Sequence, residues 1–328
     1  MFFCQLFNFC TYICNDSTIN RLYIGYLNND VTYAKIGAEQ YNLVTAENGC
    51  KWSATEPQEN KFDFTQCDYI YYFAKNNSMI FRGHNLCWGV YNPNWLTQGG
   101  FSPDQLKQIL QNHITTVMQH YSENNAYSWD VVNEAVSDSP SPGNIYKTNV
   151  WYPAIPDYVD LAFQYAKQAN PDTKLFYNDY NILMDSTWMK TKSDTVYQMI
   201  KNMTSKGIKV DGIGFQAHVK ASMYPLNYDS IVSNFQRFAD LGLEIHVTEM
   251  DVSDPQNDQT LQANMYNTVL RACRAVKSCK SFETWGYTDK YTWLGESNHP
   301  LPFDQNEQPK QAAYTIEAEL LNSSTTTV

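Results

Sequence analysis

Two glutamates stand where apolar runs of the sequence end. Glu134 follows Asn133 in WDVVNEA (129–135), and Glu249 occupies the same place in EIHVTEMD (244–251). An apolar strand normally ends in a turn residue or a neutral polar group, so a carboxylate at two such ends calls for a chemical explanation. A pair of carboxyls can cleave a glycosidic bond, because one protonates the leaving oxygen while the other attacks or activates water. Glu134 and Glu249 are therefore candidate catalytic residues.

The elements that must position these residues alternate along the chain. Eight short β-branched or aromatic runs are each followed by a stretch of helical periodicity. Helices are predicted over 102–121, where Ser102 is the N-cap and Pro103 the first helical residue, and over 155–170 and 229–242. Eight alternations over about 300 residues favour an α/β fold, a single-domain (β/α)8 TIM barrel over 21–321, rather than an open doubly wound sheet. The predicted strands cover residues 21–25, 41–46, 78–84, 128–133, 173–178, 211–216, 244–248 and 282–286.

Chemistry in such a barrel sits where strands end and the loops to the helices begin. Nearly every predicted strand is followed by polar or aromatic side chains, which a barrel used only as a scaffold would not need. Amides can bind sugar hydroxyls, and tryptophans can stack on pyranose faces. The strand-end residues are Glu47, Asn48, Lys51, His84, Asn85, Trp88, Asn133, Glu134, Asn178, Asp179, Tyr180, Asn181, Gln216, His218, Glu249, Asp251, Trp285 and Trp293.

The same residues allow two other interpretations. Each glutamate could be paired with a barrel arginine such as Arg82. Alternatively, His84, His218, Glu249 and Asp251 could converge on a metal ion, which would need three or more ligands. A histidine beside a carboxylate nucleophile has a simpler role, since it holds the carboxylate ionised and oriented. We therefore expect no metal, and because no glycine-rich phosphate loop follows any strand, no cofactor.

Composition narrows the class of partner. The net charge of −11 argues against nucleic acid or an anionic membrane, because phosphates need a basic face. No apolar run approaches the roughly 20 residues that span a bilayer. The negative charge suits a neutral ligand. As a separate expectation, the protein is a monomer.

Cysteine usage and sequons favour a secreted, extracellular protein. The chain has eight cysteines, and no pair has the C-x-x-C spacing of a zinc site. Cys273 and Cys279 enclose a short charged segment and predict a local disulfide, with two buried thiols as the alternative. N-x-S/T sequons at Asn15, Asn77, Asn202 and Asn322 add support for secretion.

The two ends of the chain are expected to lie outside the barrel. Residues 1–20 begin with an apolar stretch that lacks a basic n-region and a cleavage site, and we interpret them as an N-terminal extension or signal-peptide remnant. Residues 322–328 form a Ser/Thr-rich tail that could begin a linker to an absent carbohydrate-binding module.

Seven motifs follow one another along the chain: TAENGCKWSATEP (45–57), RGHNLCW (82–88), WDVVNEA, YNDYN (177–181), GIGFQAH (212–218), HVTEMD (246–251) and TWGYTDKYTW (284–293). Together and in this order they resemble glycoside hydrolase family 10, the retaining endo-β-1,4-xylanases. The match runs from about Tyr23 to about Leu320. The combination is far more specific than any single motif.

The resemblance implies a retaining endo-β-1,4-xylanase that cleaves internal bonds of xylan and xylo-oligosaccharides, with Glu134 as acid/base and Glu249 as nucleophile. It implies that Asn133 contacts the 2-hydroxyl of the sugar attacked, and that His218 hydrogen-bonds Glu249 with Asp251 behind it. Substrate contacts are expected from Glu47, Asn48, Lys51, His84, Trp88 and Gln216 on the glycone side, from Asn178, from Trp285 and Trp293 over the sugar attacked, and from Tyr180 on the aglycone side.

One departure from the family pattern lies after Trp88. The family commonly has Trp-His there, whereas this chain has Gly89. We expect Asn92, or a water that it holds, to occupy the space of the missing imidazole. The alternative is that Gly89 only relieves crowding beside Trp88, while Asn92 caps the turn before Pro93.

Two cysteines also depart from the pattern. Cys50 and Cys87 stand where the family usually has Met and Val. They follow neighbouring predicted strands, and we expect a disulfide between them if their Cα atoms lie about 4.4–6.8 Å apart. Such a bridge would brace Lys51 and Trp88 against each other.

Two rival functions use the same barrel. One is a glycosidase of altered specificity, acting on cellulose, mixed β-glucan or a glycosylated small molecule. The other is a non-catalytic glycan-binding barrel, which the loss of one catalytic carboxylate would mark. Both carboxylates are present in this chain.

Overall fold

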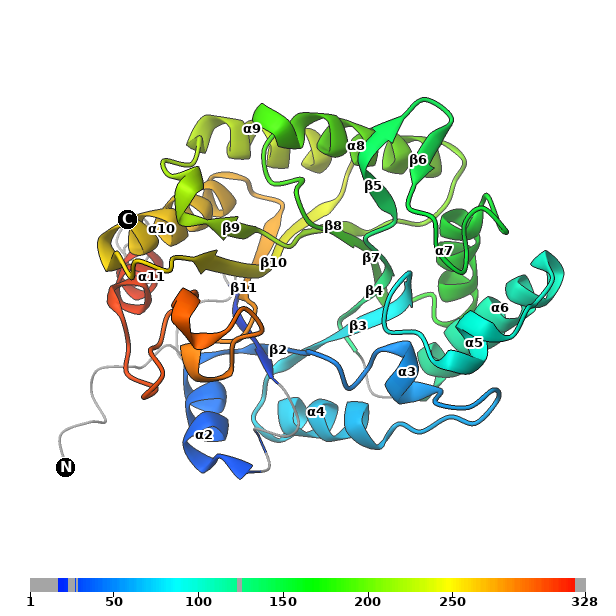
Figure 1. Ribbon diagram of the computed structural model, residues 1–328, viewed down its shortest axis with the longest axis horizontal. Coiled ribbons are helices and arrows are strands. Elements are labelled where there is room, and N and C mark those ends of the chain that lie inside the picture. The colour runs from blue at the N-terminus through cyan, green and yellow to red at the C-terminus, as the bar shows by residue number, and fades with distance from the viewer. Residues whose placement is uncertain (1–16, 23–26, 28, 123–125, 322–328) are drawn as a thin grey trace.

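The computed structural model describes residues 17–22, 27, 29–122 and 126–321. Eight strands form a parallel sheet in the order β11-β1-β2-β3-β4-β7-β8-β10, and β10 pairs with β11 to close it. This closed barrel, with helices around it, confirms the predicted (β/α)8 fold (Figure 1). The barrel strands are β1 Ser17–Leu22, β2 Leu43–Ala46, β3 Ile80–Trp88, β4 Ser128–Asn133, β7 Lys174–Asp179, β8 Gly212–Phe215, β10 Glu244–Ser253 and β11 Cys279–Thr284.

The first and last strands begin earlier than predicted. β1 begins at Ser17 and β11 at Cys279, against predicted starts at 21 and 282. The barrel thus takes in residues 17–20 of the segment expected to be an extension. Residues 1–16 and the tail 322–328 lie outside the described residues.

Helices pack against the outside of the barrel. The predicted helix over 102–121 is α6, Pro103–His120, with a complete capping box between Ser102 and Gln105. The one predicted to close on Gly242 is α9, Tyr228–Ala239, and Gly242 follows it with a φ of +86°. The other α-helices are α2 Val31–Gln40, α3 Trp52–Thr55, α4 Thr65–Asn76, α5 Asn94–Gln98, α7 Tyr158–Ala169, α8 Lys190–Ser205, α10 Gln259–Ala275 and α11 Gln311–Leu321.

Short elements extend the rim of the barrel. β5 Val136–Ser141 and β6 Asn144–Tyr146 form an antiparallel hairpin directly after β4, and β9 His218–Lys220 adds to β10. Four 3-10 turns complete the described elements: η1 Thr187–Met189, η2 Ala221–Met223, η3 Asp289–Tyr291 and η4 Glu296–Asn298. None of the helices in the part of the chain that the structure describes is long and apolar enough to cross a membrane.

The molecule buries apolar side chains between the strands and the helices, and charged ones inside the barrel. Arg82 of β3 forms an ion pair with Asp130 of β4, and both are fully buried. The Arg82 Nη1 atom also lies 2.7 Å from His246 Nδ1 and 4.0 Å from Glu283 Oε1. The guanidinium therefore neutralises acids that could not be buried alone.

The described cysteines form two disulfides. Cys273–Cys279 is bridged as predicted, with Cα atoms 5.3 Å apart. The predicted Cys50–Cys87 bridge is wrong, because Cys50 pairs with Cys67 of α4 across a Cα distance of 4.7 Å. The loop after β2 lies directly on this helix, whereas Cys87 is a buried free thiol in the apolar layer outside β3. A spatially adjacent helix, not the neighbouring strand, supplies the partner.

Candidate active site

Three amide side chains join Glu134 and Glu249 across four neighbouring strands. Asn178 Nδ2 donates hydrogen bonds to Glu249 Oε1 at 2.7 Å and to Asn133 Oδ1 at 2.8 Å. Gln216 Nε2 donates to Glu134 Oε1 at 2.9 Å and to Asn133 Oδ1 at 3.3 Å. The two carboxyls therefore belong to one constellation at the carboxyl ends of β4, β7, β8 and β10.

A glycine in β8 makes this bridge possible. Gly214 pairs in register with Asn178 of β7. A Cβ atom on Gly214 would lie 2.1 Å from Asn178 Oδ1, so any larger residue would displace that amide. The same oxygen accepts a hydrogen bond from Thr248 Oγ1 at 2.7 Å, which fixes the amide orientation toward Glu249.

Glu249 faces a histidine that carries a second carboxylate behind it. Its Oε2 lies 3.1 Å from His218 Nε2, and His218 Nδ1 lies 2.9 Å from Asp251 Oδ2. Burial alone would lower the pKa of His218, but Asp251 and Glu249 outweigh it and raise the pKa to about 10. The protonated imidazole therefore stabilises Glu249 as a carboxylate through neutral pH. Trp293 Nε1 donates to Asp251 at 2.9 Å and completes the row.

Glu134 stands in the opposite electrostatic setting. Burial, and after it the charge of Asp179, raises the pKa of its carboxyl. Its Oε2 accepts a hydrogen bond from Trp88 Nε1 at 3.1 Å. The backbone adopts a left-handed φ of +56° at Glu134, a conformation that costs a non-glycine residue of order 1–3 kcal/mol. Its backbone N–H donates to Asn178 O at 2.8 Å, which helps to hold the strained residue in place.

Lysine and aromatic rings line the side of β2 and β3. The ammonium of the buried Lys51 donates to Asn48 Oδ1 at 2.7 Å. It lies 4.0 Å from the ring centroid of Tyr91, 5.1 Å from that of Trp88 and 5.9 Å from that of Trp285. The rings of Trp88 and Tyr91 stack with centroids 5.5 Å apart. These residues form an aromatic cage around one cation beside Glu134.

The other two interpretations of these residues were a pairing with Arg82 and a metal site. Arg82 forms its ion pair with Asp130, whereas Glu249 accepts a hydrogen bond from Asn178 and Glu134 accepts one from Gln216. His84 Nδ1 lies 2.9 Å from Asp130 Oδ2, so this histidine is held by the barrel interior. Within residues 17–22, 27, 29–122 and 126–321, no group of three or more His, Cys, Asp or Glu side chains is arranged to hold a metal ion.

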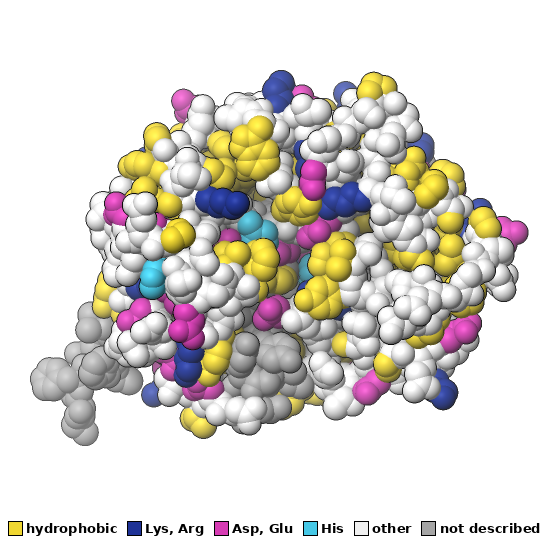
Figure 2. Space-filling model, in the orientation of Figure 1, with side chains coloured by type: hydrophobic (Ala, Val, Ile, Leu, Met, Phe, Trp, Pro, Cys, Tyr) yellow, Lys and Arg dark blue, Asp and Glu magenta, His cyan; other side chains and the backbone are white. Residues whose placement is uncertain are grey.

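The face of the molecule drawn in Figure 2 is hollowed near its centre. Acidic, histidine and hydrophobic side chains meet there, and Lys and Arg side chains lie at its edge (Figure 2). Two carboxyls, one with a raised pKa and one beside a charged imidazole, can perform acid-assisted substitution at an acetal carbon.

The comparison with known families identifies this constellation. The family model described as Glycosyl hydrolase family 10 matches residues 16–319. The chain belongs to this family. Endo-1,4-beta-xylanase B of Thermotoga neapolitana is 38% identical over 294 residues, which cover 87% of this chain and 82% of that protein. Endo-1,4-beta-xylanase B of Neocallimastix patriciarum is 39% identical over 84% of this chain, but the match spans only 31% of that longer protein.

Solved structures agree with the family assignment. The chain is similar to native xylanase 10B from Thermotoga maritima, with a TM-score of 0.88 and 37% identity. The alignment covers 94% of this chain and 96% of that one. The glycosyl hydrolase family 10 barrel is thus shared over nearly the whole chain.

The side chain beside Gly89 differs from the one expected. A Cβ atom at Gly89 would lie 2.8 Å from Asn149 Nδ2, so Asn149 fills the adjoining space. Asn92 instead donates to Trp88 O at 2.9 Å and caps the turn, as the alternative held. Asn149 Oδ1 accepts from Trp151 N and Tyr152 N, which positions its side chain in the loop before α7.

The structure brings nearly all predicted site residues into one contact network. The contacts given above join nine of them in sequence: Trp88, Glu134, Gln216, Asn133, Asn178, Glu249, His218, Asp251 and Trp293. Trp285 joins through its edge-on contacts with His84 and His218. Glu47 stands half-buried at the end of β2, beside Asn48.

Sequence reasoning missed several residues that contact this network. Tyr91 lies three positions after Trp88 and stacks on its ring. Its place in the loop after the same strand could have marked it as a site residue. Lys147 lies 3.7 Å from Glu134 Oε2, although it follows a hairpin that no strand prediction included. Lys192 of α8 pairs with Asp179 at 2.9 Å, and helical periodicity alone did not mark it.

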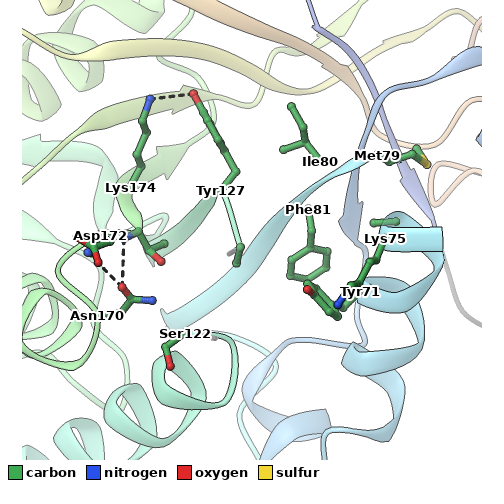
Figure 3. Close-up of a pocket in the computed structure, with 13 residues that line it drawn as sticks. Tyr71, Lys75, Met79, Ile80, Phe81, Ser122, Tyr127, Asn170, Asp172 and Lys174 are labelled. Carbon is green, nitrogen blue, oxygen red and sulfur yellow. Dashed lines mark hydrogen bonds between the residues drawn. The ribbon is translucent and has the colours of Figure 1, made fainter. Parts of the chain in front are cut away.

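A second hollow lies at the opposite end of the barrel. A cavity of about 520 Å³ is lined by residues that precede or begin β3, β4 and β7, among them Phe81, Tyr127 and Lys174 (Figure 3). Its polar groups bond one another: Lys174 Nζ donates to Tyr127 OH at 3.0 Å, and Asn170 Oδ1 accepts from the backbone of residues 172 and 173. The amino-terminal end of a barrel serves stability, so this hollow is not the active site.

Proposed function

We propose that this protein is a retaining endo-β-1,4-xylanase that hydrolyses internal bonds of xylan. The observation that carries the proposal is the opposite setting of the two carboxyls. Burial and Asp179 raise the pKa of Glu134, which suits an acid, whereas Asn178 and the His218 imidazolium stabilise a charged Glu249, which suits a nucleophile. The printed names of the relatives agree with this substrate class.

In the first half-reaction, the carboxylate of Glu249 attacks the anomeric carbon. The bond to the leaving oxygen breaks as Glu134 gives that oxygen its proton, and a covalent glycosyl-enzyme forms. Asn133, whose Oδ1 accepts bonds from Asn178 and Gln216, is fixed at the same point and can bind the neighbouring 2-hydroxyl.

In the second half-reaction, Glu134 is ionised and takes a proton from water. The resulting nucleophile attacks the anomeric carbon and the ester bond to Glu249 breaks, which restores both side chains. Two displacements at one carbon retain the configuration. The anomer that appears first from xylan, followed by proton NMR, must therefore be β.

Two substitutions test the assigned roles. Glu249→Ala should abolish turnover on every substrate, because the covalent step is lost. Glu134→Ala should lose about 10²–10⁴-fold on xylan, yet far less on aryl xylosides whose good leaving groups need little protonation. Equal losses on both substrate types would contradict the assignment of Glu134 as the acid.

The substrate class is tested by reducing-sugar release. We expect release from xylan to exceed release from carboxymethylcellulose. The reverse preference would favour a β-glucanase, and binding without release would indicate a glycan-binding barrel.

We also propose that the protein acts outside the cell and as a monomer. The Cys50–Cys67 and Cys273–Cys279 disulfides support the extracellular location, since such bonds persist in oxidising compartments. Thiol alkylation without reduction, followed by mass spectrometry of secreted and intracellular fractions, tests the compartment. Light scattering should give a mass near 37.8 kDa.

A further inference from the structure

The hairpin that follows the catalytic acid returns a lysine to it. β5 and β6 leave the barrel directly after Glu134 and lie at its rim (Figure 1). The backbone N–H of Lys147 donates to Ala135 O at 2.9 Å, so Lys147 comes back beside the residue next to Glu134. Val136 N, at the start of the hairpin, donates to Tyr177 OH at 3.1 Å and fastens it to β7.

The ammonium of Lys147 contacts the catalytic carboxyl and a phenol. Its Nζ atom lies 3.7 Å from Glu134 Oε2 and donates a hydrogen bond to Tyr180 OH at 3.0 Å. The side chain of Lys147 is 28% exposed and that of Glu134 16% exposed, so solvent screens this pair only in part.

A row of paired charges fixes the phenol that receives Lys147. Tyr180 OH donates its proton to Asp138 Oδ2 at 2.7 Å and is thereby left to accept from Lys147. Asp138 in turn binds Lys192, which also pairs with Asp179 at 2.9 Å. Because Lys192 is buried and doubly paired, the Asp138–Tyr180–Lys147 row has a rigid base.

Two acids also face Glu134, and a second ammonium, that of Lys51, lies 5.1 Å from the ring centroid of Trp88, which donates to Glu134. Asp179 of β7 and Glu249 of β10 both raise the pKa of its carboxyl, whereas Lys147 lowers it, and Gln216 and Trp88 donate hydrogen bonds to it. Lys192 is committed to Asp179 and Asp138. Among the described residues, Lys147 is thus the cation in contact with the acid.

We propose that Lys147 is a positioning residue for proton transfer, whose ammonium holds one oxygen of Glu134 and balances the two acids around it. The proposal rests on the proposed function, in which Glu134 must be protonated in the first half-reaction and ionised in the second. An ammonium anchored on Tyr180 favours the ionised state, whereas burial and Asp179 favour the protonated one. The side chain thereby keeps Glu134 able to serve in both half-reactions.

The test is the pH profile of Lys147→Met on xylopentaose. An opposite charge this close shifts a carboxyl by about one pKa unit, so its loss should move the alkaline limb of kcat/KM upward by about one pH unit. On an aryl xylobioside with a good leaving group, where breakdown of the glycosyl-enzyme limits the rate, the acid limb of kcat should move upward by a similar amount. Lys147→Arg should keep both limbs near their wild-type positions.

The control is Lys209→Met. Lys209 is comparably exposed at 22%, pairs with Asp211 at 3.2 Å and lies at the amino-terminal end of the barrel. Its removal changes the net charge equally and should leave both limbs in place. Should Lys147→Met fail to fold, Lys147→Gln gives the same measurement.

The outcomes separate this inference from the proposed function. A wild-type protein without activity on xylan would overturn the proposed function itself. An active wild type together with an active Lys147→Met protein whose limbs stay in place would overturn the role of Lys147. A limb shift that Lys147→Arg reverses supports it, since a merely structural role would lower the rate without moving the limbs.

Discussion

At the scale of single residues, the site depends on neighbours that set charge. His218 is held charged between two acids, and burial and Asp179 raise the pKa of Glu134. Lys51 shows the same principle on the side of β2 and β3, where aromatic rings surround its ammonium. Each side chain acquires its role from what touches it rather than from its type.

The aromatic cage around Lys51 gives a prediction for Tyr91. Tyr91→Ala should lower kcat/KM on xylo-oligosaccharides about threefold to tenfold, because a partly buried cation–π contact contributes about 1 kcal/mol. Tyr91→Phe keeps the ring and should retain most of the activity. Steady-state kinetics measures both, and Tyr72→Ala is the control, since Tyr72 and Tyr91 are equally exposed at 49%. Full activity in Tyr91→Ala would show that Asn48, Trp88 and Trp285 position Lys51 without Tyr91.

At the scale of elements, loops and helix ends carry the functional contacts, and the barrel strands hold them in register. The first turn of α8 supplies Lys192, which joins β7 to the β5–β6 hairpin through Asp179 and Asp138. The start of α4 supplies Cys67 to the loop after β2. Both contacts brace a loop of the active face against a helix.

Removing the ammonium of Lys192 should lower the free energy of unfolding far more than removing that of Lys190 on the same helix. Lys192→Met leaves the fully buried Asp179 without its cation, which should lower the free energy of unfolding by about 3–5 kcal/mol. Lys190→Met is the matched control on the same helix, because its pair with Asp194 is exposed and should contribute less than about 1 kcal/mol. Urea unfolding of both proteins measures the difference. Similar losses would mean that Asp179 finds another donor.

The Cys50–Cys67 disulfide should contribute to stability through the unfolded chain. It closes a loop with a sequence separation of 17, for which chain entropy predicts about 3 kcal/mol. The double variant Cys50→Ser/Cys67→Ser should therefore melt several degrees lower. Calorimetry measures this, and Cys87→Ser tests the loss of a thiol without a bridge. A melting temperature equal to that of wild type in the double variant would contradict the contribution.

At the scale of the whole molecule, two histidines make the stability of the fold depend on pH in opposite directions. Acids raise the pKa of His218 to about 10, so its contribution is complete below about 6.5 and is lost as pH rises through 10. Burial, together with Arg82, lowers the pKa of His246 to about 4. As pH falls below about 6.5 the unfolded chain protonates at His246 while the folded protein does not, so stability falls until pH 4.

His246→Asn should therefore flatten the acid side of the stability curve. The asparagine oxygen can replace Nδ1 as the acceptor for Arg82, whereas it takes up no proton. Between pH 7 and 4.5 the wild type should lose up to about 3 kcal/mol more than the variant, since one pKa unit corresponds to about 1.4 kcal/mol. Urea unfolding at both pH values measures this. Equal losses in the two proteins would show that His246 is already charged in the fold.

The sequence by itself determined the architecture and the candidate pair of carboxyls. Strand and helix periods are local, and a barrel places every strand end on one face, so a carboxylate at the end of an apolar run was bound to meet the others. Ser102 and Gln105 predicted the start of α6 for the same reason, because a capping box is completed within four residues.

Only the tertiary structure decided which loops touch. Cys50 found Cys67 rather than Cys87, Asn149 rather than Asn92 fills the space beside Gly89, and Lys147 returns to Glu134. In each case the partners come from separate loops or from a helix, and their meeting depends on packing and loop path. The spacing of residues along the chain does not predict which of them meet in space, because a loop of given length can take many paths. The surrounding contacts select one of these paths.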